Sequence, residues 1–401
     1  MSAAWTTYRL VAPCLGALAP AARLFASPPE RALWSERLGA VRLAHGCHAW
    51  VHASSMGETL GVLPLVQALR ALQPEASVHL TATTRGGRAR LAGTGESTSL
   101  APLDAPQAVA RFFAGVRPAR VLLVETELWP HWLLRARGDK VPVAIVSARL
   151  SERSLRRYLR LGPEFRRLVT GLAAVLCQSE ADARRWRELG ARPDRTAVTG
   201  NLKHDALPAA TADRPERRAA LGLDRERPLL VLGSVRPGEV RLLARAWRKL
   251  PDTLREHWQV VAVPRHPRAS AELREEAEHA GIQVVTDGVP PAGGWRWDDA
   301  LGVLARWYAA SDAAFVGGSL RPYGGHNPLE PAACGAAVVM GPHHASQHDA
   351  VRMLRERGAI TIARGGDELA AAFGAVLGNG VMRGARGAAA RAVVDDARGA
   401  A

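Results

Sequence analysis

The chain has 401 residues, 47% of them hydrophobic and 23% charged, which is the composition of an ordinary globular protein. This length exceeds one ordinary hydrophobic core and predicts two domains. Its four cysteines lack the spacing of a disulfide framework, and the neighbouring His343, His344 and His348 form no metal-binding signature. We therefore exclude a disulfide-stabilised scaffold and expect no bound metal.

The net charge of +15 is unevenly distributed. Residues 1–170 hold 22 Lys and Arg against 11 Asp and Glu, a net charge of +11, whereas residues 171–401 hold 31 against 27, a net charge of +4. An excess on one half predicts a polyanionic partner, which could be nucleic acid, an anionic membrane or a phosphorylated substrate. An arginine-rich proteome would raise the total charge but explains the asymmetry less well.

Residues 10–22 are uncharged and apolar. They are fewer than the about 20 residues that span a bilayer, and Pro13 and Pro20 weaken a continuous helix. The segment predicts a helix lying in the membrane interface. A buried N-terminal helix is one alternative, and a cleaved signal peptide, preceded only by Arg9, is another.

Beyond this segment strand and helix signals alternate, which predicts parallel sheets with helices on both faces. Residues 198–205 are the predicted crossing between halves, and residues 209–227 are the connector and first helix of the second half. We predict strands at residues 47–53, 77–81, 120–124, 141–146, 173–177, 228–232, 259–263, 282–285, 313–316 and 337–340. We predict helices at residues 60–72, 105–115, 129–136, 154–168, 181–189, 239–250 and 270–280.

Residues 315–343 carry the most informative pattern: a buried strand, a glycine-rich loop, a short helix and a second strand. Asn327 can cap that helix, Pro328 suits its first turn and Gly335 can end it. Such a loop offers backbone N–H groups and a positive dipole end, which favour a phosphate. Glu330 would repel the phosphate and suits ribose hydroxyls instead. The pattern predicts a nucleotide-sugar site, and the alternative is a loop rich in glycine for packing alone.

Three acids follow predicted strands, and Lys203 lies within the predicted crossing. Glu58 opens a helix, where it could be the base that accepts a proton from a hydroxyl, or could simply stabilise the helix dipole. Glu125 and Glu127 end a buried strand, where acids are costly unless paired or functional. Glu127 could orient an acceptor or balance a cation, and Lys203 could reach the charge of a transition state.

Arg265 follows another strand, within Pro264-Arg-His-Pro. Its planar fork suits a phosphate or a carboxylate, and the alternative is an ordinary surface turn. Residues 233–239 form a similar turn from strand to helix that could add N–H donors.

The motifs SSMGE, VETELWP, SARLSERS, VTGNLKHD, VPRHP and FVGGSLRPYGGHNPLEPAACG occur in this order. In them the chain resembles the 3-deoxy-D-manno-octulosonic acid (Kdo) transferases of lipopolysaccharide synthesis. The resemblance implies an α/β protein of the GT-B fold, with two Rossmann-like doubly wound domains facing an interdomain cleft. It also implies inverting transfer of Kdo from CMP-Kdo to a phosphorylated lipid A precursor (lipid IVA), without metal or cofactor, at the cytoplasmic face of the bacterial inner membrane.

The expected domains are a membrane-associating segment (residues 1–30), an acceptor-binding domain (residues 31–203) and a CMP-sugar-binding domain ending in a helix (residues 204–401). By resemblance, Glu58 matches the proton acceptor, and Glu127 and Lys203 match positions that support the transition state. The expected CMP site comprises Pro264, Arg265, Leu301, Gly302, Val303, Gly317, Gly318, Ser319, Asn327, Pro328, Leu329 and Glu330.

Three positions depart from the family pattern. Val303 replaces the usual acid, Ser147 stands where asparagine is common, and residues 83–87 differ from the usual threonine-rich turn. These differences would fit a divergent member with another acceptor or donor.

Two other functions remain open. A UDP-sugar 2-epimerase or another GT-B enzyme would share the fold. A non-catalytic protein that binds lipid A or nucleic acid would not need Glu58, Glu127, Lys203 and Arg265 together. We expect no specific nucleic-acid partner, because binding through net charge alone is non-specific and is lost with salt.

Overall fold

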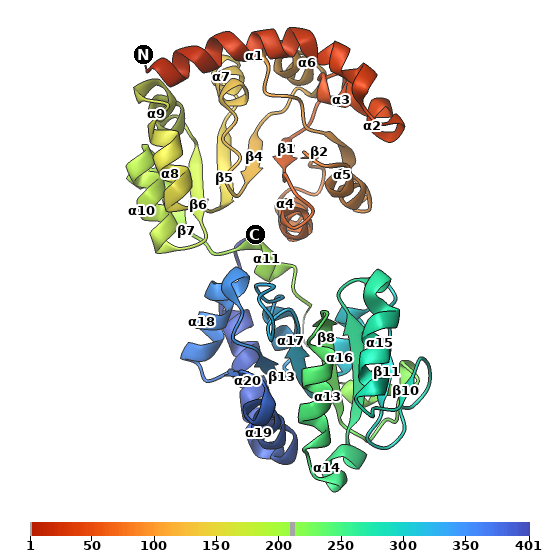
Figure 1. Cartoon of the computed structure of the whole chain (residues 1–401). Helices are drawn as coiled ribbons and strands as arrows, with labels where there is room; N and C mark the ends of the chain where they lie inside the picture. The colour runs from red at the N-terminus through yellow and green to blue at the C-terminus, as the bar shows by residue number, and fades with distance from the viewer. Residues whose placement is uncertain (1, 209–212) are drawn as a thin grey trace. The chain divides into compact units, whose positions relative to one another are not determined.

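The computed structural model describes residues 2–208 and 213–401, which fold into two compact α/β units (Figure 1). One unit contains the chain up to Ala206 together with Ala397–Ala401, and the other contains Leu207–Asp396. The sequence predicts a domain boundary after residue 203, whereas the compact units divide after Ala206.

The first unit is built on a seven-stranded parallel sheet in the order β3-β2-β1-β4-β5-β6-β7. Its interior strand β1 is buried along its whole length, as expected where helices cover both faces of a sheet. The strands are β1 (Ala49–His52), β2 (Val78–Ala82), β3 (Ser97–Leu100), β4 (Val121–Val124), β5 (Val143–Ala148), β6 (Ala174–Cys177) and β7 (Thr196–Val198).

Aromatic side chains fill much of the core beside this sheet. Trp50 is fully buried, and its ring centroid lies 4.7 Å from that of Phe112 and 4.9 Å from that of Trp132. The α-helices are α1 (Ala3–Ala22), α2 (Pro28–Ala32), α3 (Trp34–Arg37), α4 (Val62–Leu72), α5 (Arg85–Ala92), α6 (Pro106–Val116), α7 (Pro130–Gly138), α8 (Glu152–Leu159), α9 (Pro163–Thr170), α10 (Glu180–Leu189) and α11 (Leu202–Asp205). The 3₁₀ turns are η1 (Arg23–Phe25), η2 (Glu58–Gly61) and η3 (Pro193–Arg195).

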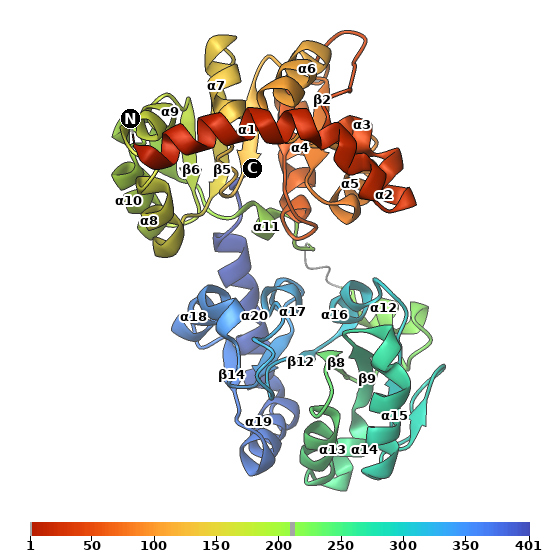
Figure 2. The ribbon, with the colours of Figure 1, turned by 45° about the horizontal axis from the view of Figure 1, so that its top comes forward.

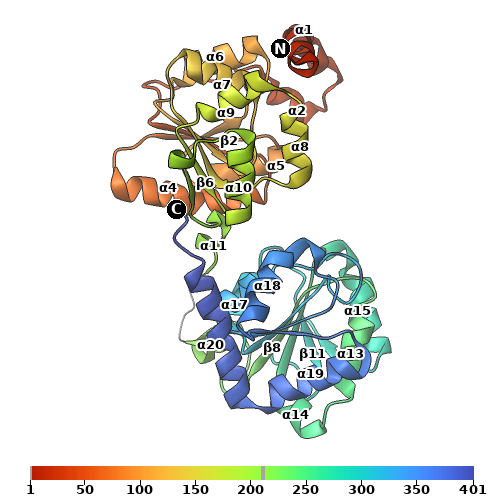
Figure 3. The same ribbon diagram turned by 90° about the vertical axis from the view of Figure 1, so that its left-hand side faces the viewer.

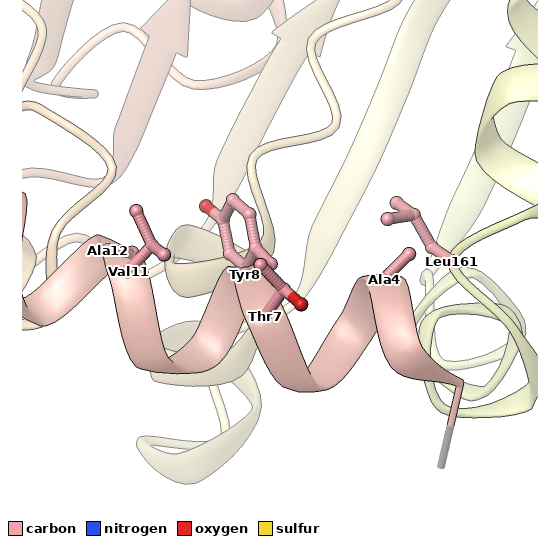
Figure 4. Close-up of a pocket in the computed structure, with 6 residues that line it drawn as sticks. All are labelled: Ala4, Thr7, Tyr8, Val11, Ala12 and Leu161. Atoms are coloured by element: carbon pink, nitrogen blue, oxygen red, sulfur yellow. The ribbon is translucent and has the colours of Figure 1, made fainter.

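Helix α1 runs across one face of the first unit beside α6 (Figure 2). It continues through Pro13 and Pro20. A cavity of about 470 Å³, with mostly apolar walls, lies along it; its walls are formed by Ala4, Thr7, Tyr8, Val11, Ala12 and Leu161 (Figure 4). No helix in the described part of the chain combines the length and the apolar character that a membrane span requires.

The second unit repeats the architecture with a parallel sheet in the order β10-β11-β9-β8-β12-β13-β14. The predicted α/β class with doubly wound parallel sheets is therefore confirmed. The strands are β8 (Leu229–Val235), β9 (Gln259–Pro264), β10 (Val284–Val285), β11 (Trp295–Trp297), β12 (Ala313–Val316), β13 (Ala337–Met340) and β14 (Ile360–Ile362).

Helix α20 packs beside α17 and α19 within this unit (Figure 3). The predicted connector begins at residue 209, and its first four residues, 209–212, lie outside the described residues. The helices and 3₁₀ turns are α12 (Arg214–Ala220), α13 (Val240–Arg248), α14 (Asp252–His257), η4 (Pro267–Ala269), α15 (Ser270–His279), α16 (Leu304–Ala310), α17 (Leu329–Ala333), η5 (Ala345–Gln347), α18 (His348–Glu356), α19 (Gly366–Gly378) and α20 (Gly380–Asp396).

After α20 the chain returns to the first unit. The Asp205 carboxylate at the end of α11 accepts hydrogen bonds from Gly399 N at 2.6 Å and Ala401 N at 2.8 Å. Ala400 packs against the apolar cluster that contains Leu202. The last residues thereby support the short helix that carries Lys203.

Candidate active site

The predicted site residues follow the central strands of both sheets. In the first sheet β1 lies between β2 and β4, and in the second β8 lies between β9 and β12. At these positions the strand order reverses, and loops leaving neighbouring strands at their carboxyl ends diverge and leave room for a ligand. The loops after β1, β4, β8, β9 and β12 carry most of the predicted residues.

Glu58 lies in the turn after β1, at the start of η2. Its carboxylate accepts hydrogen bonds from Ser54 N at 2.7 Å and from Ser55 Oγ at 2.9 Å. Burial raises the pKa of Glu58; the hydrogen bond from Ser55 opposes this rise, and the nearby charges of Glu125 and Glu127 add to it. The result is a fixed, half-buried carboxylate that accepts a proton more readily than an ordinary glutamate.

Glu127 follows β4 and has a different environment. Its Oε2 accepts a hydrogen bond of 2.7 Å from Trp129 Nε1 and lies 3.6 Å from the Nε2 of the fully buried His52. Burial raises the pKa of Glu127, but the interactions with His52 and Trp129 outweigh it and lower the pKa overall. Glu127 is therefore suited to remain ionised beside Glu58.

His52 is held from its other side by Thr81. The hydroxyl of Thr81 accepts a bond of 2.7 Å from Trp50 Nε1 and lies 2.9 Å from His52 Nδ1. If the hydroxyl donates its own hydrogen to Nδ1, the proton of a neutral imidazole is on Nε2, which faces Glu127. No feature of the sequence around His52 marks it as a functional residue.

Lys203 pairs with Glu125 rather than with Glu127. Its Nζ lies 2.5 Å from Glu125 Oε1, and Glu125 adopts a left-handed backbone conformation with φ of 63°. Asn201 Oδ1 caps the turn by accepting from Lys203 N at 3.0 Å. The sequence suggests Glu127 as the acid that could balance a cation. Which of the two acids pairs with Lys203 depends on tertiary structure, which the sequence does not show.

The glycine-rich loop of the second unit differs from the expectation. The N–H groups of Gly318, Ser319 and Leu320 all donate to the Glu239 carboxylate at 2.8 Å, and Arg236 N donates to it at 2.9 Å. Glu239 is fully buried. The prediction that this loop offers unoccupied N–H groups is therefore wrong for these three residues, because an internal carboxylate already occupies them. The turn at residues 233–239 was expected to add N–H donors to the site. It instead supplies the Glu239 carboxylate, which accepts hydrogen bonds from the loop.

The segment after this loop forms the predicted short helix, but Pro328 rather than Asn327 is its N-cap residue. Asn327 Oδ1 accepts from Leu329 N at 3.0 Å just before the helix, and Gly335 follows the helix with φ of +70°. The helix has only five residues, so its dipole contribution is small. Burial raises the pKa of Glu330, while its hydrogen bond from Asn327 and the charge of Arg265 oppose the rise.

Arg265 directly follows β9 and is exposed. Its backbone N–H donates to Val235 O at 3.0 Å, which joins the ends of β9 and β8. In the residues that the structure describes, its guanidinium forms neither a hydrogen bond nor an ion pair. It is therefore available to an anionic ligand.

Leu301, Gly302 and Val303 precede α16. Leu301 is 85% exposed, whereas Val303 is buried in the cluster that contains Trp307 and Tyr308. A valine side chain that faces the core cannot reproduce the polar contact of an acid. A ligand contact at this turn would have to come from the backbone.

The two parallel seven-stranded sheets with their helices have the fold that GT-B glycosyltransferases and nucleotide-sugar epimerases share. The UDP-GlcNAc 2-epimerase of Neisseria meningitidis, solved with UDP-GlcNAc, matches with a TM-score of 0.60 at 14% identity, over 86% of this chain and 98% of that chain. A glycosyltransferase of Rickettsia africae matches with a TM-score of 0.57 at 13% identity, over 88% and 94%. At such low identity the likeness shows the fold alone.

The sequence identifies the family within this class. Residues 32–206 match the model of the 3-deoxy-D-manno-octulosonic-acid transferase (kdotransferase) family. The Kdo transferase of Bordetella pertussis is 38% identical over 76% of this chain and 73% of its own length, and that of Haemophilus influenzae is 31% identical over 88% and 84%. The chain belongs to the Kdo transferase family, which confirms the resemblance in the six motifs and makes it a glycosyltransferase.

Proposed function

We propose that this glycosyltransferase moves Kdo from CMP-Kdo to a hydroxyl of a phosphorylated lipid A precursor, lipid IVA. The main support for the proposal is the environment of the Glu58 carboxylate in a chain of the Kdo transferase family. Glu58 is a half-buried carboxylate, held by two hydrogen bonds, with a raised pKa. Such a group is suited to accept the proton of an attacking hydroxyl.

In the proposed reaction the first unit binds the acceptor and the second binds the donor. Glu58 takes the proton as the acceptor oxygen attacks the anomeric carbon, and the bond from that carbon to the phosphate oxygen breaks. Glu127, which stays ionised, orients the acceptor, and Lys203 supports the developing charge. Attack from the face opposite the departing CMP inverts the anomeric centre.

The donor site is proposed around Arg265 and the segment from Asn327 to Glu330. We propose that the exposed Arg265 contacts the phosphate and that Glu330 contacts the ribose hydroxyls. Fixed cationic groups can stabilise the charge of the leaving phosphate, so we propose that transfer requires no metal. The backbone of residues 301–303 and of Gly317 is proposed to complete the nucleotide pocket.

We further propose that the enzyme works at the cytoplasmic face of the bacterial inner membrane. The outer side of α1 and the turn after it expose large apolar side chains, among them Leu10, Leu18 and Phe25. The excess of basic residues in the first half would add attraction to anionic lipid.

The test supplies CMP-Kdo and a tetraacylated glucosamine disaccharide bisphosphate, with and without a chelator, and weighs the lipid products by mass spectrometry. We expect products heavier by one or more Kdo residues in both conditions. Thermal unfolding with CMP or UDP provides a second measurement, in which CMP should stabilise the protein. Stabilisation by UDP alone, or an unmodified acceptor, would contradict the proposal.

A further inference from the structure

The N–H groups of Gly318, Ser319 and Leu320 cannot be offered to a ligand while Glu239 accepts them at 2.8 Å. A phosphate bound where β8, β9 and β12 end therefore needs other donors. The arginines that follow β8 and β9 carry unused N–H donors, and His326, in the glycine-rich loop, has a buried ring nitrogen without a partner among the described residues.

Arg236 directly follows β8 and is half-buried. Its Nη1 lies 3.1 Å from His266 Nε2, and its guanidinium carbon lies 4.2 Å from the centroid of the Tyr323 ring. These contacts fix the guanidinium plane. Its Nε is buried and has no hydrogen-bond partner among the described residues. A fixed guanidinium with an unused donor suits an anion with several oxygens.

His326 lies against the glycine-rich loop. A Cβ placed on Gly318 would come within 3.0 Å of His326 Nε2, so this glycine leaves room for the imidazole. In the described part of the chain that buried Nε2 has no hydrogen-bond partner. Burial, together with the charges of Arg265, Arg236 and His266, lowers the pKa of His326 to about 4. Placing an anion among these groups would reverse the electrostatic effect on the imidazole.

The cationic groups here are not neutralised by the protein. Across residues 2–208 and 213–401, neither Arg236 nor Arg265 forms an ion pair with a carboxylate, and Glu239 bonds only to backbone N–H groups. Buried unpaired donors and uncompensated charge are costly unless a ligand uses them.

We propose that Arg236 and His326, together with Arg265, form the binding site for the phosphate of the donor nucleotide. This inference rests on the proposed use of CMP-Kdo. The phosphodiester of that donor carries one negative charge. When its bond to the anomeric carbon breaks, the electron pair stays on the phosphate oxygen and CMP leaves with two negative charges, while the acceptor proton goes to Glu58. The side-chain site holds the added charge without using the loop N–H groups.

The experiment compares CMP with cytidine, which lacks the phosphate, by isothermal titration calorimetry. The variants are Arg236→Met, His326→Gln and, as a control, Arg245→Met, which removes an exposed arginine of α13. We expect each site variant to weaken CMP binding by about tenfold to a hundredfold, with cytidine binding changed by less than about twofold. The control should bind both ligands as the wild type does.

The inference is overturned if both site variants fold, by their thermal unfolding, and still distinguish CMP from cytidine as well as the wild type. Wild-type protein that binds neither ligand would instead overturn the proposed donor. If a variant does not fold, NMR titration of the wild-type histidines replaces it. Saturating CMP should raise the pKa of His326 while leaving that of His79, which is also lowered to about 4, unchanged. An unchanged pKa of His326 would count against the site.

Discussion

At the scale of single residues, Glu58 and Glu127 of the first unit have pKa values shifted in opposite directions. Burial and like charge raise the pKa of Glu58, whereas the contacts with His52 and Trp129 lower that of Glu127. Separating two titratable groups in this way assigns them different tasks in one site. One can accept a proton while the other remains an anion.

If Glu58 is the base that we propose, replacing it with glutamine should slow transfer by about 10²- to 10⁴-fold. CMP affinity should be retained, since the variant does not alter the second unit. Steady-state transfer assays across pH would test both points. In the wild type the rate should fall on acidification, starting at a higher pH than for an ordinary glutamate, because the raised pKa protonates the base earlier. A Glu75→Gln variant, at an exposed position, is the control and should match the wild type.

Glu239 is the second residue whose removal should be informative. An amide at this position would direct an NH₂ group at backbone N–H donors and break some of the bonds from Gly318, Ser319, Leu320 and Arg236. We expect Glu239→Gln to lower the free energy of unfolding by about 2–4 kcal/mol and to weaken CMP binding. Urea denaturation and calorimetry would measure these effects. Unchanged stability would show that the carboxylate does not hold the loop.

At the scale of helices and strands, the sequence predicted most of the buried strands, but it missed the short buried strand β11 and the edge strands β3, β7 and β14. The buried strands β1, β4, β8, β9, β12 and β13 all fall within or beside predicted ranges. Strands β3, β7 and β14 lie at sheet edges and include exposed or half-exposed residues, so no apolar run marks them. The predicted helix at residues 154–168 is two helices, because Gly162 has φ of 88° and Pro163 begins α9.

The site was predictable to a similar extent. Glu58 and Arg265 stand in turns that follow predicted strands, so the sequence places them at the carboxyl end of a sheet. The pairing of Lys203 with Glu125, and the 79 to 81 residues that separate Glu239 from its loop partners, depend on tertiary structure. No local pattern reports such contacts.

Helix α1 presents two different sides. Trp5, Ala12 and Ala19, spaced seven residues apart, are buried, whereas Leu10 and Leu18 are 67% and 66% exposed. Replacing Leu10, Leu18 and Phe25 together with serine should reduce binding to phosphatidylglycerol-containing vesicles by at least about tenfold, because apolar area is lost from the interface. Vesicle sedimentation would test this. Leu72→Ser, which alters an exposed leucine of α4, should have no effect.

Asp104 links α1 to the start of α7. It accepts a hydrogen bond from Tyr8 Oη and bonds of 3.0 and 3.2 Å from the backbone N–H groups of His131 and Trp132. Burial raises the pKa of Asp104 from 3.8 to about 7, although these backbone bonds oppose the rise. The folded state therefore holds this proton more tightly than the unfolded state, which makes its contribution to stability largest in acid.

Relative to an Asp104→Asn variant, wild-type stability should fall as the pH rises from about 4 to about 7 and then level off. Urea denaturation at a series of pH values measures this difference. A difference that stays constant across the range would show that Asp104 titrates alike in the folded and unfolded states.

At the scale of the whole molecule, the second unit is inserted into the first. Residues Ala397–Ala401 belong to the first unit, although all of Leu207–Asp396 precedes them. Deleting residues 397–401 removes two partners of Asp205 and the packing of Ala400. We expect the first unit to unfold a few degrees lower and transfer to slow through disturbance of Lys203. CMP affinity should be preserved, and loss of CMP binding in calorimetry would contradict this separation of effects.

This return of the chain also constrains biogenesis. Asp205 meets Gly399, which the ribosome adds 194 residues later. Domains commonly fold in the order in which they emerge during translation. The first unit therefore lacks the bonds from Gly399 and Ala401 to Asp205, beside Lys203, until the second unit has been translated. Premature termination within the second unit would thus release a first unit that is folded incompletely, as well as a protein without a complete second unit.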